Sequence, residues 1–212
     1  MTGPARTRRR PAEVRALLLA AAEKLFALKG YADATTDEIA AEAGVTRSVM
    51  YRHFPTKADL FREAVLNPFI EFLRDYRSVW QSQLDDRWPP DRIMQTMVTL
   101  LYDNIRGHRD AVVGLVSARN TLPPEMSREV DQLFEQFFAD MLVIGSDLSE
   151  PLGWVPIDDD LELSIRLVFG MVASAAVLDP IFLPKGRRRP SGERLIARLS
   201  ALGIYGLRLE AP

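Results

Sequence analysis

Between residues 46 and 57 the chain carries side chains that can donate hydrogen bonds to nucleic acid. They are hydroxyls, a guanidinium, a phenol, an imidazole and an ammonium, carried by Thr46, Arg47, Ser48, Tyr51, His53 and Lys57. A guanidinium can donate two hydrogen bonds to O6 and N7 of guanine in the major groove. A short helix that presents such groups on its outer face suits recognition of a DNA groove. The chemistry indicated is binding to duplex DNA.

Two short helices joined by a tight turn are predicted to position these groups. Thr35 can cap the first helix, with Glu38 returning a hydrogen bond to the N–H of the cap. Gly44 follows where the chain must take a left-handed conformation to end that helix, which a side chain would disfavour. Thr46 can then cap a second helix, whose inward face is Val49, Met50 and Phe54.

This segment resembles the N-terminal helix-turn-helix of the TetR family of transcriptional regulators, over residues 12–62. The resemblance implies that Tyr51 contacts phosphate and that His53 contacts the DNA backbone. Ser48 departs from the pattern, because the family often carries glycine there, where the backbone runs close to DNA. The matching residues, at fixed spacing, are Gly30-Tyr31, Thr35-Thr36, Ile39-Ala40, Ala43-Gly44-Val45, Tyr51, His53-Phe54, Lys57 and Leu60.

The remaining DNA contacts are predicted from the residues themselves. Arg47 either contacts DNA, at a base or a phosphate, or lies solvated on the helix, and the first reading is favoured. Lys57 begins a further helix, where its ammonium and the free backbone N–H groups can bind one phosphate. Thr36 and Thr46 are caps first, and DNA contact is compatible with capping. The arginines at 6 and 8–10 form a basic arm that either enters a minor groove or adds only nonspecific attraction.

The distribution of charge agrees with a DNA-binding N-terminus. The whole chain has a net charge of −2, but residues 1–57 carry a balance of +4 and the rest a balance of −6. Because a basic surface attracts the phosphate backbone, only the first part of the chain is expected to meet DNA.

The sequence predicts an all-α protein of about nine helices, three in the N-terminal unit and six in the body. Helical spacing of apolar residues runs through nearly every long segment, and alternating strand patterns are absent. The first helix is predicted from Pro11 to Lys29, with Gly30 as its stop. Later helices are predicted at 56–76 with a kink or break at Pro68, 91–106, 111–120, 123–144, 158–178 and 191–209, with a loop at 145–156. The predicted domains are an arm (1–10), a helix-turn-helix domain (11–57) and a ligand-binding and dimerisation domain (58–212).

Many aromatic and methionine side chains in the body form either a plain core or the wall of a cavity for an apolar ligand. The resemblance to the TetR family implies the second, since the body of that family is a ligand-binding domain. The candidate pocket residues are Phe72, Tyr76, Met97, Leu101, Tyr102, Arg119, Phe134 and Phe138.

The last two predicted helices form a candidate pairing surface, and the resemblance implies a homodimer built on such a pair. Small residues allow a second helix to approach closely, and larger apolar residues supply contact area. The candidates are Gly170, Ala173, Ser174, Leu195, Leu199, Leu202 and Tyr205. Two recognition helices related by two-fold symmetry would read an inverted repeat.

Nothing in the sequence indicates catalysis, a cofactor, a metal or a membrane span. Cysteine is absent, and the carboxylates at 158–160 and Glu162 are explained by the positive end of a helix. The best apolar run, Leu167 to Leu178, is twelve residues, whereas a span needs roughly 20. We therefore expect a cytoplasmic, homodimeric, DNA-binding regulator, a repressor released by a small apolar or amphipathic ligand. The alternative is a DNA-binding regulator with a filled body and no inducer, acting constitutively or through a protein partner.

Overall fold

The structure is a computed structural model that describes residues 10–83, 88–152 and 160–207. Every regular element within these residues is helical, so the predicted all-α class is confirmed. Contacts divide the chain into two compact units, one of residues 1–69 and 110–127 and the other of residues 70–109 and 128–212. This division by contacts differs from the functional division at residue 57, which stays a prediction.

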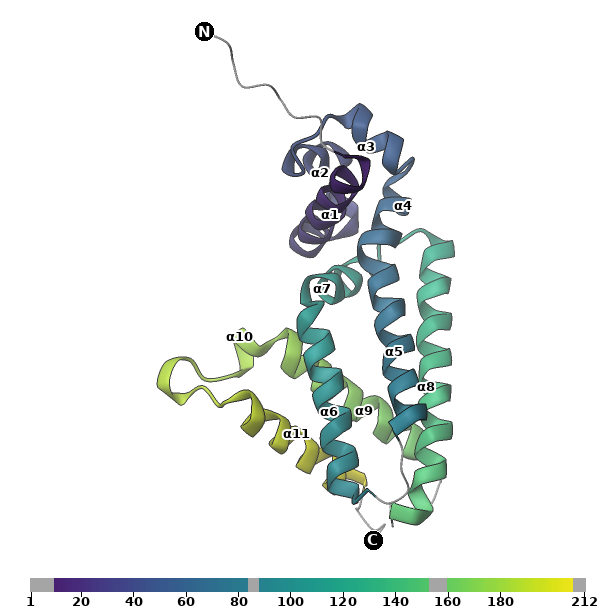
Figure 1. Cartoon of the computed structure of the whole chain (residues 1–212), viewed down its shortest axis with the longest axis vertical. Coiled ribbons are helices and arrows are strands. Elements are labelled where there is room, and N and C mark those ends of the chain that lie inside the picture. The colour runs from purple at the N-terminus through teal and green to yellow at the C-terminus, as the bar shows by residue number, and fades with distance from the viewer. Residues whose placement is uncertain (1–9, 84–87, 153–159, 208–212) are drawn as a thin grey trace. The chain divides into compact units, whose positions relative to one another are not determined.

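The first unit holds the helix-turn-helix and the helices that support it (Figure 1). Phe26 of the first helix meets Phe61 edge to face, with ring centroids 5.0 Å apart, and Tyr31 packs against both rings. Gly114 brings a later helix close to the first, because a Cβ at this position would lie 3.6 Å from backbone atoms of Phe26 and Ala27. The elements are α1 (Pro11–Asp33), α2 (Thr36–Glu42), α3 (Arg47–His53), α4 (Lys57–Phe61), the π-helical turn η1 (Arg62–Leu66) and α7 (Arg109–Ala118).

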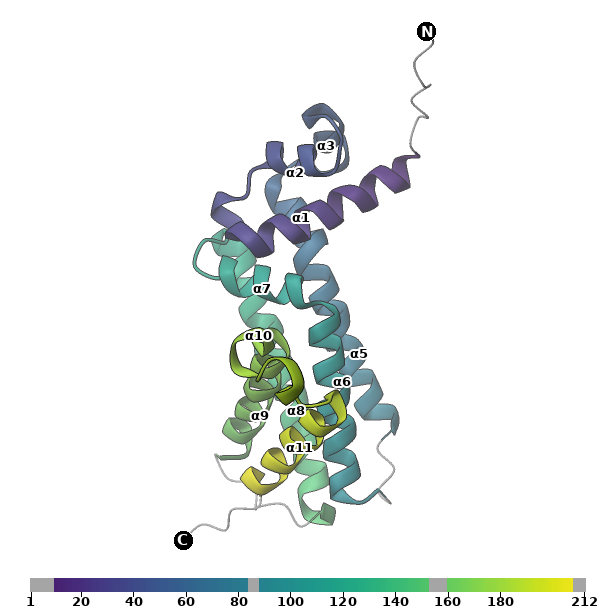
Figure 2. The ribbon, with the colours of Figure 1, turned by 90° about the vertical axis from the view of Figure 1, so that its left-hand side faces the viewer.

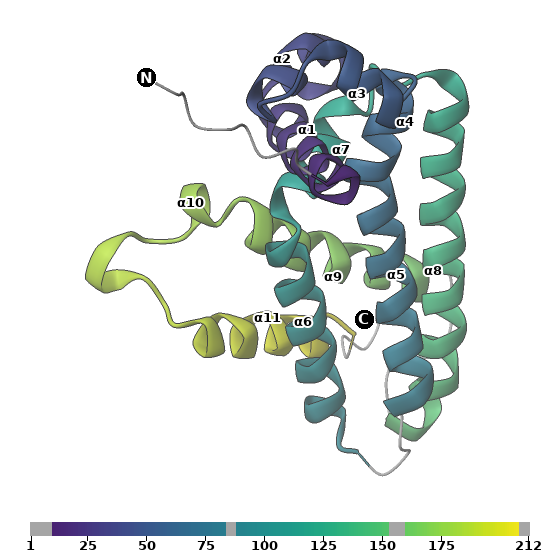
Figure 3. The same cartoon turned by 45° about the horizontal axis from the view of Figure 1, so that its top comes forward.

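The second unit contains the long helices of the body. Helices α6, α9 and α11 pack against one another (Figure 2), and α5 and α8 run side by side (Figures 1 and 3). Gly203 of α11 lies where a Cβ would be 3.1 Å from the sulfur of Met94 in α6, so these two helices touch closely. The elements are α5 (Asn67–Gln83), α6 (Pro90–Gly107), α8 (Pro124–Leu152), α9 (Asp160–Val177), α10 (Asp179–Phe182), the 3-10 turn η2 (Gly186–Arg188) and α11 (Gly192–Leu207). The first residues of α5 and α8, up to 69 and 127, belong to the first unit.

The predicted kink or break at Pro68 takes the form of a widened helical turn. The N–H of Asn67 bonds to the carbonyl of Arg62, five residues back, so η1 joins α4 to α5 without leaving helical conformation. Proline has no N–H, and its ring clashes with the carbonyl four residues earlier in a regular helix. The π-helical turn lies directly before Pro68, at the place where a regular helix would meet this clash.

The loop predicted at 145–156 is wrong for its first eight residues, because α8 continues to Leu152. The sequence suggests a helix stop at Gly145, yet a Cβ there would lie 3.1 Å from Cδ1 of Ile165 in α9. The glycine is therefore a point of close helix packing rather than an end of the helix. Residues 153–159, which include the last four residues of that loop and two of the aspartates before α9, lie outside the described residues.

Candidate nucleic-acid interface

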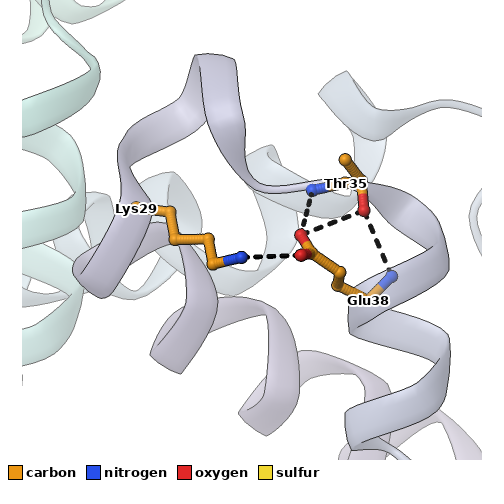
Figure 4. A network of polar contacts seen from close by, with 3 residues as sticks. All are labelled: Lys29, Thr35 and Glu38. Carbon is orange, nitrogen blue, oxygen red and sulfur yellow. Dashed lines mark hydrogen bonds and ion pairs between the residues drawn. The ribbon is translucent and has the colours of Figure 1, made fainter.

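The N-terminus of α2 is held by a reciprocal cap, as predicted. The hydroxyl of Thr35 accepts from the N–H of Glu38, and the Glu38 carboxylate accepts from the N–H and hydroxyl of Thr35 (Figure 4). Lys29 adds an ion pair, with its Nζ 2.6 Å from the same carboxylate. The Lys29 ammonium, followed by the Thr35 hydrogen bonds, lowers the pKa of Glu38 from 4.5 to about 2. The start of α2 is thus tied to the end of α1.

The turn between α2 and α3 has the geometry that the sequence predicts. Gly44 has φ +65°, in the left-handed region that a side chain disfavours. The N–H of Val45 bonds to the carbonyl of Ala40, which closes the end of α2. The hydroxyl of Thr46 accepts from the N–H of Val49, so α3 begins with the predicted cap. Met50 of α3 is fully buried, so it marks the face of this helix that points into the domain.

Four side chains at the outer surface of α2 and α3 contact one another and form a cluster, Thr36–Asp37–Arg47–Tyr51. Arg47 Nη1 lies 3.0 Å from Asp37 Oδ2, and its guanidinium carbon lies 5.4 Å from the centre of the Tyr51 ring. Tyr51 Oη lies 3.1 Å from the hydroxyl of Thr36, so the prediction that Thr36 is a cap is wrong: Thr35 caps α2, and the Thr36 side chain contacts α3 instead. The contacts with Thr36 and with the Arg47 guanidinium lower the pKa of Tyr51. Side chains of the first turn of α2 therefore bind Arg47 and Tyr51, two residues of α3 that are predicted to contact DNA.

Lys57 has partners within the first unit that the sequence did not predict. Its ammonium donates to the carbonyl of Ala32 at 2.9 Å and lies 4.6 Å from the centre of the Tyr31 ring. Desolvation lowers the pKa of Lys57, and the nearby Asp33 carboxylate acts in the opposite direction. The side chain is half-buried and ties the start of α4 to the end of α1. One of the three N–H groups of its ammonium therefore already donates a hydrogen bond within the protein, which leaves two for a phosphate.

The other predicted DNA contacts differ in exposure. Ser48 and Thr46 are exposed, and the ring of half-buried His53 lies 6.5 Å from that of Phe54, which is buried. Arg10 is the only arginine of the basic arm within the described residues, and it is exposed at the start of α1. These positions stay predictions as DNA contacts.

Asp37 is the residue of this surface that sequence reasoning missed. It lies one position after Thr36, and the sequence pattern assigns it no role. Its link to Arg47 crosses the turn between the two helices, over ten residues. Local spacing therefore carries no signal for the pair.

The candidate pocket residues fall into both units. Phe72, Tyr76, Leu101, Tyr102 and Phe138 are buried in the second unit, where Met97 and Phe134 are half-buried. Arg119 is exposed in the first unit, where its guanidinium donates to the hydroxyl of Ser127.

Several of these residues belong to an aromatic cluster around α8. Phe72 contacts Tyr76, Tyr76 contacts Phe137, and Phe134 stacks on Phe138, with ring centroids 5.9–6.3 Å apart. An open cavity of about 440 Å³ lies against this cluster, between α5 and α8, and its lining includes Phe137 but none of the eight candidates.

The candidate pairing residues are partly exposed. Gly170, Ser174 and Leu202 are exposed, Ala173 and Leu195 are half-buried, and Leu199 is buried within the chain itself. The side chain of Tyr205 lies outside those described. Exposed Leu163 and Leu167 continue the line of Gly170 and Ser174 along α9 and were not among the candidates.

Metal-binding and membrane-spanning features are absent from the described residues. These residues contain no cluster of three metal-binding side chains. None of their helices combines the length and apolar character that a membrane crossing requires.

Comparison with known proteins places this surface in a family. Residues 18–64 match the family model for bacterial regulatory proteins of the tetR family. The HTH-type transcriptional repressor BepR of Brucella suis is 28% identical over 171 residues, which cover 79% of this chain and 80% of BepR. The HTH-type transcriptional activator FasR of Mycolicibacterium smegmatis is 30% identical over 97 residues, 46% of this chain and 44% of FasR.

A solved structure shares the fold over nearly the whole chain. The TetR family transcriptional regulator PfmR from Thermus thermophilus superposes with a TM-score of 0.70 at 21% identity, over 91% of this chain and 99% of PfmR. The family and these relatives are transcriptional regulators rather than enzymes. The capped helix-turn-helix, the matching family model and the shared fold agree: residues 18–64 carry the helix-turn-helix of the tetR family of bacterial regulatory proteins, and the chain shares the fold of a TetR family transcriptional regulator.

Proposed function

We propose that this protein is a cytoplasmic, homodimeric repressor that binds an inverted-repeat operator and is released by a small apolar or amphipathic ligand. The observation that carries the DNA-binding part is the Thr36–Asp37–Arg47–Tyr51 cluster, which presents a guanidinium and a phenol together on the outer surface of α3. The choice of repressor follows BepR, a repressor that aligns with 79% of this chain, whereas the activator FasR aligns with 46%.

The proposal of a homodimer rests on an apolar stripe along α9. Leu163, Leu167, Gly170 and Ser174 are all exposed, and their spacing of four, three and four residues places them on one face of the helix. The two leucines are 54% and 63% exposed. A Cβ at Gly170 would meet no atom within 4 Å, so a second helix has room to approach there. Leu202 of α11 is 59% exposed and adds apolar area in the same unit.

Symmetric pairing also suits the small size of the recognition helix. α3 has seven residues, which span only about 10 Å at 1.5 Å per residue. One copy therefore reads few base pairs, and two copies related by a two-fold axis read an inverted repeat and add their binding energies.

Release by a ligand requires reciprocal coupling between the two binding events. A ligand that weakens operator binding must itself bind more weakly when operator is present, by the same factor. Equal ligand affinity with and without operator would contradict the proposed release. Such a result would favour the rival regulator with a filled body and no inducer.

The pairing surface is tested by placing a charge on the stripe. Leu167→Glu should convert the dimer to a monomer and weaken operator binding, because the carboxylate would be buried between two copies. Leu28→Glu is a matched control, since Leu28 is 70% exposed on α1 and lies outside the stripe. Sedimentation measures the oligomeric state, and a Leu167→Glu protein that remains as dimeric as Leu28→Glu contradicts the proposed surface.

A further inference from the structure

The open cavity between α5 and α8 combines apolar side chains with an arginine, and we infer that it binds an amphipathic anion. In this inference Arg74 binds the anionic head, and an apolar floor of Leu73 and Phe137 receives a short hydrocarbon chain. The binding claim goes beyond the proposed repressor and does not depend on release from an operator.

The floor of the cavity is apolar and held in place from behind. Leu73 and Phe137 are 3% and 5% exposed, and half-buried Ile70 and Leu133 also line the cavity. The Phe137 ring contacts those of Tyr76 and Phe138, with centroids 5.9 and 5.3 Å away. A floor supported in this way does not need to rearrange in order to receive a hydrocarbon chain. The volume of about 440 Å³ falls within the usual range for small-molecule sites.

Three of the polar residues of the cavity already satisfy one another. Asp140 Oδ2 accepts from Arg77 at 2.8 Å, and Asp140 Oδ1 accepts from the side-chain amide of Gln136 at 3.0 Å. Both oxygens of the carboxylate are therefore engaged, and the charge of Arg77 is balanced by that of Asp140.

Arg74 is left as the uncompensated charge. It lies three residues before Arg77 on α5, lines the same cavity and is exposed. It has no ion pair or hydrogen bond with any residue within the described ranges. A guanidinium binds a carboxylate through two parallel charge-assisted hydrogen bonds, so the site favours an anionic head over a neutral or cationic one. Together with the apolar floor, this selects an anion that carries a hydrocarbon chain.

The test compares three ligands with nearly equal alkyl chains and different heads, added to the full-length protein below the micelle concentrations of the two ionic ligands and below the solubility limit of octan-1-ol. Calorimetry measures binding of octanoate, octan-1-ol and octyltrimethylammonium. We expect octanoate to bind at least tenfold more tightly than the other two. Equal affinities for the three, or no binding of octanoate, would overturn the inference.

Two variants locate the binding. Arg74→Gln should weaken octanoate binding by roughly tenfold and leave octan-1-ol unchanged, because only the charged head loses its partner. Leu133→Gln should weaken both ligands, since it removes part of the apolar lining. As a control, Arg187→Gln removes an exposed arginine of η2 in the same unit and should change neither ligand. If Arg74→Gln keeps the wild-type affinity for octanoate, the anion binds elsewhere and the assignment fails.

Discussion

Removal of the Asp37 charge should weaken sequence discrimination without preventing the protein from folding. Asp37 holds the Arg47 guanidinium at 3.0 Å, beside the Tyr51 ring. The variant Asp37→Asn keeps the shape of the side chain and removes its negative charge. Arg47 then loses the partner that restricts its orientation and samples more positions over α3.

The cost in stability should be small, as the exposure of the pair shows. The side chains of Arg47 and Asp37 are 63% and 60% exposed, so their ion pair contributes at most about 1 kcal/mol. Asp37 also lies in the first turn of α2, where a carboxylate adds about 0.3–1 kcal/mol. The total loss of at most about 2 kcal/mol is below the roughly 5–15 kcal/mol of a typical domain, so the variant remains folded in a binding assay.

The effect on discrimination is bounded by the value of one base contact. A well-placed arginine contributes about 1–3 kcal/mol against the wrong base, which is roughly 5- to 150-fold in affinity. Arg47→Ala should lose this discrimination fully, and Asp37→Asn should lose a measurable part of it. The assay is fluorescence anisotropy with the preferred operator and with operators changed at single base pairs, at two salt concentrations.

A matched variant separates orientation from charge. Glu42→Gln removes one negative charge from the same helix, where Glu42 pairs with Lys24 at 2.5 Å instead of with Arg47. Both variants should tighten binding to unrelated DNA slightly, because each removes repulsion from phosphate. Only Asp37→Asn should reduce discrimination. If the two variants discriminate equally well while Arg47→Ala does not, Asp37 does not position Arg47 and the reasoning is refuted.

Three further predictions concern the same unit. Gly44→Ala should lower the free energy of unfolding by about 1–2 kcal/mol, because Gly44 has a left-handed backbone conformation. Thermal denaturation measures the change. Gly107→Ala is the control, since Gly107 has no positive φ and a Cβ there would meet no atom within 4 Å. Because the pKa of Glu38 is lowered in the folded protein, its carboxylate contributes to the free energy of unfolding above pH 4.5, and this contribution is lost as the pH falls toward about 2. The melting temperature of Glu38→Gln should therefore fall less steeply over that range than that of the wild type, and parallel curves would contradict the role of the Lys29 pair. Lys57→Met keeps an unbranched stem over the ring of Tyr31 and should weaken all DNA similarly, lowering the salt slope by about 1, whereas an unchanged slope would limit Lys57 to its structural contact.

The parts of the fold that the sequence predicts well are those set by local spacing. A cap needs only an oxygen and an N–H three residues apart, so the caps at Thr35 and Thr46 follow directly from residue type. Gly44 is equally local, since one backbone conformation is required at that turn. The capped helix-turn-helix could therefore be placed to within a residue or two.

Glycine at 145 shows where local reasoning fails. A glycine can end a helix or let another helix come close, and nothing in the neighbouring residues distinguishes the two. The deciding contact is with Ile165 of α9, twenty residues away in sequence. The wrong loop at the end of α8 has this cause.

The candidate sites divide in the same way. Arg47 and Tyr51 were predicted on the outer face of α3, because helical periodicity determines which residues face outward. Their partner Asp37 could not be found, because its contact depends on how α2 and α3 cross. The residues of the cavity between α5 and α8 were also missed, since Arg74 and Gln136 come together only when two distant helices pack.

The measurement that tests the central claim most directly is selection of bound fragments from random duplex DNA, at low and at near-physiological salt. Nonspecific binding through phosphates weakens steeply as salt rises, whereas base contacts retain their discrimination. We predict an enriched inverted repeat that survives near-physiological salt and whose enrichment is lost in Arg47→Ala. Binding that disappears with salt and enriches no sequence would contradict this prediction, leaving only a basic surface.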